Sequence, residues 1–334
     1  MTPSRRCVVL DASQPAEVRR VAAALAAERG FDETAVGAVA LVVTEAATNL
    51  LKHAGGGEIL LRVLPETERA IEVLALDKGR GMRNVAQCRS DGYSTSGSPG
   101  IGLGSIARLS AVTEIYSQIG RGTALLARLP RGPDHSTAWS NSPLIGGLTV
   151  ALAGQTDCGD AWGAVARTTG TALVVVDGLG HGPLAAEAAG VALRAFQSHA
   201  AQAPGEVLEA MHASLRGTRG AAAAVVALDE DRALLTFAGV GNISGSVVAA
   251  GGSRRLFSHN GIVGHAMPHR QEFTYPWPRR AVLVLHSDGL TPHWRMDAYP
   301  GLEGHHPSLI AGVLYRDFAR GRDDATVVVV KDGA

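Results

Sequence analysis

Acidic residues stand at the ends of apolar runs at widely separated places in the second half of the chain. Asp177 and Asp288 each end such a run and precede a glycine, Asp323 comes just before another run, and Asp160 lies upstream of the first. An apolar run ending in Asp-Gly is typical of a buried strand that carries a carboxylate at its end. Acids at the ends of separate strands are what a two-metal site on a sheet needs. Each Asp-Gly taken singly is equally consistent with an ordinary turn.

The glycine that follows Asp177 adds a ligand of another kind. Gly178 has no side chain to shield its carbonyl oxygen, and oxygen ligands suit hard divalent cations. The motif Asp-Gly-Leu-Gly-His-Gly that it belongs to precedes an Ala-rich segment, 183–195, which predicts a helix.

A second group of polar residues lies in the first half. Glu45, Asn49 and His53 are spaced by four residues in a segment otherwise rich in Ala, Val and Leu, which places them on one face of a helix. That face is either a functional stripe or simply the solvated side. A Gly-rich stretch, 91–104, runs into a predicted helix at about 105–109, and a helix N-terminus binds phosphate well. Its glycine spacing matches neither the dinucleotide fingerprint nor the Lys-containing phosphate loop.

Hydrophobic periodicity predicts the elements that position these residues. In the first half we expect two helices, 16–28 and about 31–53, and strands at 6–10, 58–64, 70–76, 112–118 and 123–129. In the second half we expect helices at about 184–197, 205–215 and 308–318, and strands at about 147–153, 160–168, 171–176, 222–227, 233–237, 245–249, 281–285 and 325–330. A Pro- and Ser-rich stretch without periodicity separates the halves, which predicts domains at 1–132 and 145–334 joined by a linker at 133–144.

Composition limits the classes of function. Lys plus Arg and Asp plus Glu both total 31 in 334 residues, so no net field favours nucleic acid or an anionic membrane surface. The three cysteines have no metal-ligand spacing and fit reduced thiols in a cytoplasm. The N-terminal apolar run, 7–10, is too short for a signal peptide, and we expect no membrane span. The sequence therefore predicts a cytoplasmic protein.

The first half resembles the GHKL ATPase superfamily, and within it the RsbT-like serine kinases of the stressosome. The resemblance rests on the Glu45, Asn49, His53 helix, on Asp77-x-Gly79-x-Gly81, on the lid ending in Gly102-Leu-Gly104, and on Gly122-Thr123. It implies that Asn49 holds Mg²⁺, that Asp77 binds the adenine amino group of ATP, and that Glu45 orients the attacking serine. It gives His53 a role at the helix end or behind the metal. It also implies a nucleotide pocket completed by Gly79, Gly81, Gly102, Gly104 and Thr123.

The second half resembles the SpoIIE and RsbX branch of the metal-dependent PPM serine/threonine phosphatases. The matching pieces are Gly159-Asp160, the Asp177 motif, Gly239-Val-Gly-Asn-Ile243, Asn260-Gly-Ile-Val-Gly264, Ser287-Asp288-Gly289 and Asp323-Asp324-Ala-Thr326. The resemblance implies that Asp177 bridges two Mn²⁺ or Mg²⁺ ions. It places Asp160 and the Gly178 carbonyl on one ion and Asp288 and Asp323 on the other, with Asp324 behind them. Two features depart from the family. His181 comes two residues later than the usual histidine, so it is either a general acid or a structural or substrate-contacting residue. The phosphate-binding arginine of the family has no clear counterpart in this sequence.

Together the resemblances imply an α+β chain: a GHKL (Bergerat) α/β sandwich followed by a PPM-type α-β-β-α sandwich. They imply a bifunctional switch that phosphorylates and dephosphorylates STAS-domain regulatory proteins in a stress or sigma-factor partner-switching pathway. Two alternatives stay open: the GHKL domain binds nucleotide only as a sensor, or it sequesters a sigma factor or another partner. Histidine kinase action is disfavoured, because no helical hairpin with a phospho-acceptor histidine precedes the domain.

Overall fold

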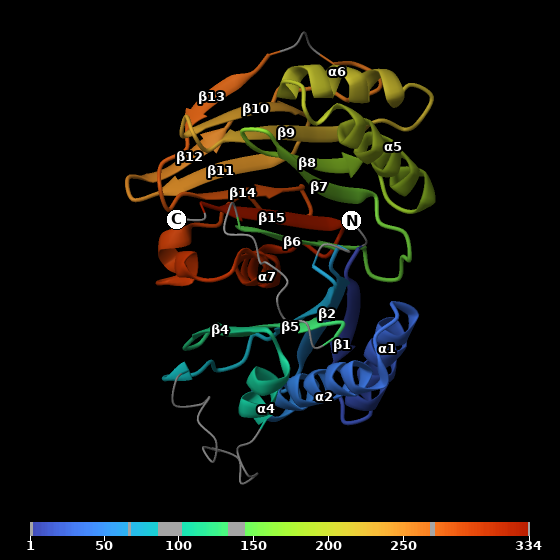
Figure 1. Ribbon diagram of the computed structural model, residues 1–334, viewed down its shortest axis with the longest axis vertical. Coiled ribbons are helices and arrows are strands. Elements are labelled where there is room, and N and C mark those ends of the chain that lie inside the picture. Colours follow the sequence, from blue (N-terminus) through green and yellow to red (C-terminus); the bar gives the residue numbers. More distant parts are fainter. Residues whose placement is uncertain (1–2, 66–67, 86–101, 133–143, 268–270, 333–334) are drawn as a thin grey trace. The chain divides into compact units, whose positions relative to one another are not determined.

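The computed structural model describes residues 3–65, 68–85, 102–132, 144–267 and 271–332 (Figure 1). They form two compact units. The N-terminal unit comprises Thr2–Trp139 and also Asp297–Arg316, and the C-terminal unit comprises Ser140–Met296 and Asp317–Ala334. The predicted boundary near residues 133–144 remains a prediction from the sequence, and most of that stretch, like the first part of the predicted Gly-rich lid, lies outside the described residues.

The N-terminal unit contains a five-stranded antiparallel sheet with helices packed on one face (Figure 1). The strand order is β1 (Arg5–Val9), β2 (Gly57–Val63), β3 (Ala70–Leu76), β5 (Gly122–Pro130) and β4 (Val112–Gln118). The helices are α1 (Gln14–Glu28), α2 (Glu33–Asn49) and α4 (Gly102–Leu109). Apolar side chains of the helices and of alternate strand positions form one buried cluster, as the 3.6- and 2-residue periods predict.

Helix α2 carries Glu45 and Asn49 of the predicted polar stripe and runs through the core of this unit, whereas His53 lies in the turn after it. Asp32 caps its start, because its Oδ1 accepts a hydrogen bond from the Ala35 N–H at 2.7 Å. After Asn49 the helix continues as a π-helical turn, Leu50–Ala54, which Gly55 ends with a φ of 74°. By length and composition the combined stretch Glu33–Ala54 is the one helix in the described ranges that could cross a membrane, a test that buried core helices also pass. Its apolar side chains, among them Val39 and Val43, lie in the core of the unit.

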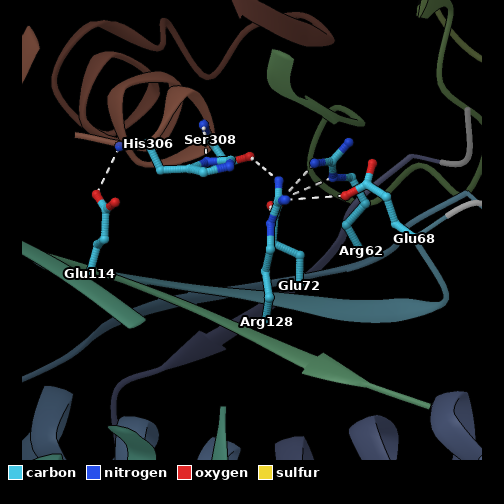
Figure 2. A network of polar contacts seen from close by, with 7 residues as sticks. All are labelled: Arg62, Glu68, Glu72, Glu114, Arg128, His306 and Ser308. Atoms are coloured by element: carbon cyan, nitrogen blue, oxygen red, sulfur yellow. Dashed lines mark hydrogen bonds and ion pairs between the residues drawn. The ribbon is translucent and has the colours of Figure 1, made fainter. Parts of the chain in front are cut away.

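The other face of this sheet carries charged residues that are buried. Arg62, Glu72 and Arg128 lie directly opposite one another on β2, β3 and β5, and each is less than 5% exposed. Both Glu72 carboxylate oxygens are paired, Oε1 with Arg62 Nη2 at 2.7 Å and Oε2 with Arg128 Nε at 2.8 Å (Figure 2). These arginines hold the pKa of Glu72 at about 2 despite its burial. The charges are therefore compensated within the sheet.

Segment Asp297–Arg316, which contains most of α7 (Pro307–Phe318), covers this charged face. Arg128 Nη2 donates a hydrogen bond to Ser308 Oγ at 3.2 Å, and the His306 N–H donates to Glu114 Oε2 at 2.8 Å (Figure 2). Gly312 lies against the side chains of Leu74 and Leu76. A segment from late in the sequence therefore completes the N-terminal unit.

The C-terminal unit contains two five-stranded antiparallel sheets. One has the order β13 (Phe273–Pro276), β10 (Leu234–Val240), β9 (Ala221–Asp229), β8 (Gly170–Gly178) and β7 (Asp160–Arg167). The other has the order β12 (Gly252–Leu256), β11 (Ser244–Ala249), β14 (Val282–His286), β15 (Ala325–Lys331) and β6 (Leu144–Val150).

Two apolar cores hold these layers together. Helices α5 (Pro183–His199) and α6 (Pro204–Ser214) pack through small residues and Phe196 on the first sheet, and the second core lies between the sheets (Figure 1). Layered sheets with helices outside, following a helix-covered sheet, confirm the predicted α+β fold class. The difference from the expected α-β-β-α layering is that most of α7 groups with the N-terminal unit.

Candidate metal centre and nucleotide site

Two strands of the first sheet bring the first pair of acids together. The antiparallel register of β7 and β8 places Asp160 directly opposite Asp177. Asp160 is 4% exposed, and its Oδ2 accepts a hydrogen bond from Ser287 Oγ at 2.6 Å. Ser287 belongs to the loop after β14, so this bond links the ends of the two sheets.

The second pair of acids lies at one end of β14 and β15. Asp288 follows β14 by two residues and Asp323 precedes β15 by two, and the register pairs His286 with Val327. Asp288 and Asp323 line the same open hollow. Asn242 Nδ2 donates a hydrogen bond to Asp288 Oδ2 at 2.8 Å and so fixes the direction of that carboxylate.

The electrostatics show that the two pairs face one another. Burial raises the pKa of Asp177 to about 7, and the charges of Asp288, Asp323 and Asp324 contribute to the shift. Burial, the Asp177 charge and then Asp324 raise the pKa of Asp160 well above its ordinary value, although its bond from Ser287 opposes the shift. Negative charge thus accumulates where the strands of both sheets end, and a bound dication would relieve this repulsion.

Asp324 differs from its neighbours because backbone donors occupy its carboxylate. Its Oδ2 accepts from the Gly159 N–H at 2.5 Å and its Oδ1 from the Leu152 N–H at 2.7 Å. These bonds hold the loop before Asp160. The arrangement fits the position behind the metal ligands that the resemblance implies.

The predicted metal ligands lie at the same end of the two sheets but do not form a closed cage. Among the residues that the structure describes, no group of three or more His, Cys, Asp and Glu side chains could hold an ion by itself. The expected assignment gives one ion two carboxylates, from Asp160 and Asp177, and the other ion three, from Asp177, Asp288 and Asp323. Both ions keep positions for a backbone oxygen or for water, as Mg²⁺ prefers. Gly178 supports this, because a Cβ there would collide with the Ala185 carbonyl, so only glycine fits at the predicted carbonyl ligand.

His181 lies on the exposed loop after β8. Burial, Asp288 and Asp324 raise the pKa of Asp323, and the charge of His181 opposes that shift. The imidazole is therefore near enough to influence the acids, although no described hydrogen bond ties it to them.

In the N-terminal unit the predicted catalytic helix meets the start of α4. A Cβ built on Gly102 would lie 2.7 Å from Glu45 Oε2 and 3.9 Å from Asn49 Nδ2, so the start of α4 lies close to both side chains. Asn49 Nδ2 is buried without a hydrogen-bond partner. Gly104 is buried in the first turn of α4. The unpartnered Asn49 Nδ2, beside a helix start, fits a phosphate oxygen, whereas the amide oxygen of Asn49 is the atom that would ligate Mg²⁺.

The predicted adenine site is formed by the residues after β3 and by β5. Asp77 Oδ1 accepts hydrogen bonds from the Gly79 N–H at 2.8 Å and from the Thr123 N–H at 3.1 Å. Within the described residues Asp77 Oδ2 has no partner, which leaves it available to an exocyclic amine. A Cβ on Gly79 would lie 2.6 Å from Ala54 Cβ, and one on Gly81 would collide with the Gln118 carbonyl. These glycines let two loops approach, and the residues present fit ATP.

Three polar residues contribute to the two sites without having been assigned roles from the sequence. Asn242 donates a hydrogen bond to Asp288, and Ser287 donates one to Asp160. Both lie inside matching motifs, so their position next to a motif glycine or aspartate was the sequence signal that could have identified them. Arg316 Nη1 donates to the Asp77 carbonyl at 3.2 Å. It lies 239 residues from Asp77 in the sequence, and no local pattern marks it.

Comparison with known proteins identifies both parts of the chain. A model of the histidine kinase-like ATPase domain matches residues 8–129, and a model of stage II sporulation protein E (SpoIIE) matches residues 167–331. The serine/threonine-protein kinase RsbT of Bacillus subtilis (strain 168) is 30% identical over 110 residues, which cover 33% of this chain and 83% of RsbT. The phosphoserine phosphatase RsbX of the same strain is 24% identical over 140 residues, which cover 41% of this chain and 69% of RsbX.

Two solved structures resemble a little more than half of the chain. A structure described under "The bacterial stressosome: a modular system that has been adapted to control secondary messenger signaling" aligns with a TM-score of 0.52 and 30% identity, covering 57% of this chain and 99% of the other. RsbX in complex with magnesium aligns with a TM-score of 0.50 and 19% identity over 58% of this chain and 96% of RsbX, a likeness of fold. The chain therefore belongs to two families, the histidine kinase-like ATPase domains through residues 8–129 and the SpoIIE/PPM family through residues 167–331.

Proposed function

We propose that the C-terminal unit is a Mg²⁺- or Mn²⁺-dependent phosphatase of phosphoserine or phosphothreonine proteins. The observation that carries the proposal is the meeting of Asp160 and Asp177 from one sheet with Asp288 and Asp323 from the other. The similarity to RsbX, a phosphoserine phosphatase, supports it.

The chain's residues have distinct parts in this reaction. Asp177 would bridge two dications, with Asp160 and the Gly178 carbonyl on one and Asp288 and Asp323 on the other. When bound, such a pair supplies an activated water and screens the phosphoryl oxygens during in-line displacement. Ser287 and Asn242 orient Asp160 and Asp288 through their hydrogen bonds. No protein nucleophile and no covalent phosphoenzyme are needed.

The N-terminal unit has the residues of an ATP-dependent serine kinase. Asn49 would hold Mg²⁺, Asp77 Oδ2 would accept from the adenine amine, and Glu45 would orient the substrate serine at the γ-phosphate. Phosphoryl transfer depends mainly on positioning and charge screening, which a carboxylate one helical turn from the metal-binding amide provides. By similarity to RsbT, we propose STAS-domain regulatory proteins of a stress or sigma-factor partner-switching pathway as substrates of both units.

One observation favours a second candidate, in which the N-terminal unit is a nucleotide sensor or a partner-binding module. Arg316 contacts the carbonyl of Asp77, and segment Asp297–Arg316 interrupts the SpoIIE-family region of the sequence. Arg316 thus connects the residue expected to bind adenine to a segment that leads along the chain to Asp323. A sensor needs Asn49 and Asp77 but has no use for Glu45.

The test uses the whole chain, because Asp297–Arg316 belongs to the N-terminal unit. The purified protein is given a phosphorylated STAS-domain protein with Mn²⁺, Mg²⁺ or EDTA, and phosphate release is measured. Metal-dependent release supports the phosphatase, and equal release with EDTA refutes the two-metal mechanism.

The kinase is tested in the Asp177→Asn background, so that the phosphatase cannot remove the product. We expect Glu45→Ala to keep ATP binding and lose transfer, whereas Asn49→Ala loses both. If the parent transfers no phosphate to any STAS-domain protein offered, while ATP changes the phosphatase rate of the wild type, the sensor is correct.

A further inference from the structure

An open hollow of about 450 Å³ lies beside the predicted metal centre. Its lining combines two of the predicted metal ligands, Asp288 and Asp323, with Thr291, Arg320 and Arg322. All five belong to the C-terminal unit, on the loop after β14 and the loop before β15. The hollow therefore joins two carboxylates to two guanidinium groups at the point where the reaction would take place.

Backbone hydrogen bonds fix these two loops against each other. Leu290 and Ala319 form a β-bridge. The Thr291 N–H donates to the Phe318 carbonyl at 3.0 Å, and the Arg320 N–H donates to the Gly289 carbonyl at 2.8 Å. The backbone of Arg320 is thus held next to the residue that follows Asp288, so both loops position their side chains together.

The two arginine side chains are exposed, and neither guanidinium has a hydrogen bond or an ion pair with any residue in the described ranges. This distinguishes them from Arg62 and Arg128, whose guanidinium groups are both paired with Glu72. If Arg320 and Arg322 served only to neutralise the neighbouring acids, they would be expected to pair with them. Instead they leave their donors available at the hollow.

We infer that Arg320 and Arg322 bind the phosphoryl oxygens of the substrate and hold its phosphate against the side of the centre formed by Asp288 and Asp323. The inference rests on the proposed phosphatase function. A guanidinium offers paired N–H donors that match phosphate oxygens, and this match distinguishes arginine from lysine. A hollow that combines acids able to hold cations with free guanidinium donors suits a phosphate dianion. These arginines would take the place of the phosphate-binding arginine that the sequence comparison lacks.

The test compares wild type, Arg320→Ala, Arg322→Ala and Arg322→Lys in the full chain at saturating Mn²⁺. Substrates are p-nitrophenyl phosphate and phosphoserine peptides with acidic or neutral flanks, and inorganic phosphate serves as competitive inhibitor. The matched control is Arg232→Ala, because Arg232 is an exposed arginine beyond Asp229, at the other end of β9. Asp229 lies seven residue steps along β9 from Ala222, the partner of Asp177, which is about 23 Å.

We expect each alanine variant to raise KM for all substrates and the inhibition constant of inorganic phosphate by roughly ten- to hundredfold, the range of a charged hydrogen bond. Lysine at 322 should restore part of the affinity, and Arg232→Ala should match wild type. A higher KM for the acidic-flanked peptide alone would overturn the inference, because the arginines would then recognise the flank. Full recovery at higher Mn²⁺, or no change in KM and inhibition constant, would also overturn it.

Two controls separate this outcome from other failures. Circular dichroism shows whether each variant is folded, and calorimetric titration of inorganic phosphate into the Mn²⁺-loaded protein measures binding without turnover. If wild type shows no phosphatase activity at all, the proposed function fails, whereas an active wild type with unaffected arginine variants refutes only the role of the arginines.

Discussion

Buried carboxylates occur in both units, and their neighbours give them opposite properties. Glu72 in the N-terminal unit lies between Arg62 and Arg128, and these charges hold its pKa at about 2. Asp177 in the C-terminal unit is also largely buried, but the charged groups that shift it are other acids, and its pKa rises to about 7. Burial disfavours the charged form in both places.

The difference shows how to separate a structural charge from a functional one. Glu72 and its arginines satisfy one another and need nothing from outside the protein. The acids around Asp177 repel one another, and the folded chain tolerates this because their positions are fixed by Ser287, Asn242 and the strand register. Uncompensated charge held in place by hydrogen bonds is therefore the sign of a cation site. The following expectations test this comparison.

The largest expected effect on stability concerns the buried ion pairs of Arg62, Glu72 and Arg128. Arg128→Met leaves Glu72 with one arginine and breaks the bond to Ser308, and removing one member of a buried pair costs about 3–5 kcal/mol. Urea unfolding of the full chain measures the loss. Arg6→Met is the control, because the Arg6 pair with Glu58 is partly exposed and contributes about 1 kcal/mol or less. Equal losses in the two variants would show that the network does not hold segment Asp297–Arg316.

The acids around Asp177 should gain stability from a bound metal ion, whereas the ion pairs of Glu72 should not. Each Mn²⁺ ion bound at about 100 times its Kd should stabilise the wild type by about 2.7 kcal/mol. Asp288→Asn should lose most of this gain and, without metal, should be as stable as wild type or more stable, because it removes a repelling charge. Thermal unfolding with and without Mn²⁺ checks both points. A metal-free Asp288→Asn that is clearly less stable would assign Asp288 a structural role instead.

Asp324 combines features of Glu72 and of Asp177. It is buried among acids like Asp177, but its carboxylate accepts hydrogen bonds from two backbone N–H groups. Asp324→Asn should cost about 1–3 kcal/mol, because the amide nitrogen cannot accept one of these bonds. It should also lower phosphatase activity roughly ten- to hundredfold through the misplaced Asp160 loop. Unchanged activity in a destabilised variant would limit Asp324 to stability.

The smallest effect is a pH dependence in the N-terminal unit. Burial and then the charge of Arg128 lower the pKa of His306 to about 4 from its ordinary 6.5. As the pH falls, the unfolded chain therefore takes up a proton on this histidine at a higher pH than the folded chain does. The stability that the neutral imidazole contributes is complete above pH 6.5 and is lost as the pH falls to about 4. We expect a loss of about 1–2 kcal/mol, since part of the side chain reaches solvent.

His306→Asn isolates this effect. Asparagine keeps an acceptor for the Ser308 N–H at the start of α7 and removes the titrating group. Urea unfolding at pH 7 and pH 4.5 should show a smaller decrease for the variant than for wild type. Equal decreases in both proteins would contradict the assignment to His306.

The sequence predicted the parts of the molecule that depend on local pattern. Strands β3, β4 and β15 and helices α1, α5 and α7 lie close to their expected ranges, because their apolar periods are regular. The short edge strands β12 and β13 were not expected, since Gly252–Leu256 is almost entirely polar and exposed and Phe273–Pro276 ends in proline. Tertiary pairing determines such strands.

What the sequence could not predict depends on contacts between distant residues. Arg62, Glu72 and Arg128 alternate with apolar residues and have the pattern of a solvent-facing side, yet Asp297–Arg316 covers them. The convergence of the acids was expected, whereas the supports from Ser287 and Asn242 appear only when loops far apart in sequence meet. The individual metal and nucleotide roles of the site residues remain predictions.

The central claim is that the acids of the C-terminal unit hold two dications, with Asp177 shared between them. Calorimetric titration of Mn²⁺ into the metal-free full chain, in wild type and in Asp177→Asn, tests it most directly. The Asn49→Ala background removes the predicted metal site of the N-terminal unit, and ATP is left out. We expect two bound ions in the parent and at most one weakly bound ion in Asp177→Asn. Binding of two ions with unchanged affinity in Asp177→Asn, or of none in the parent, would contradict the claim.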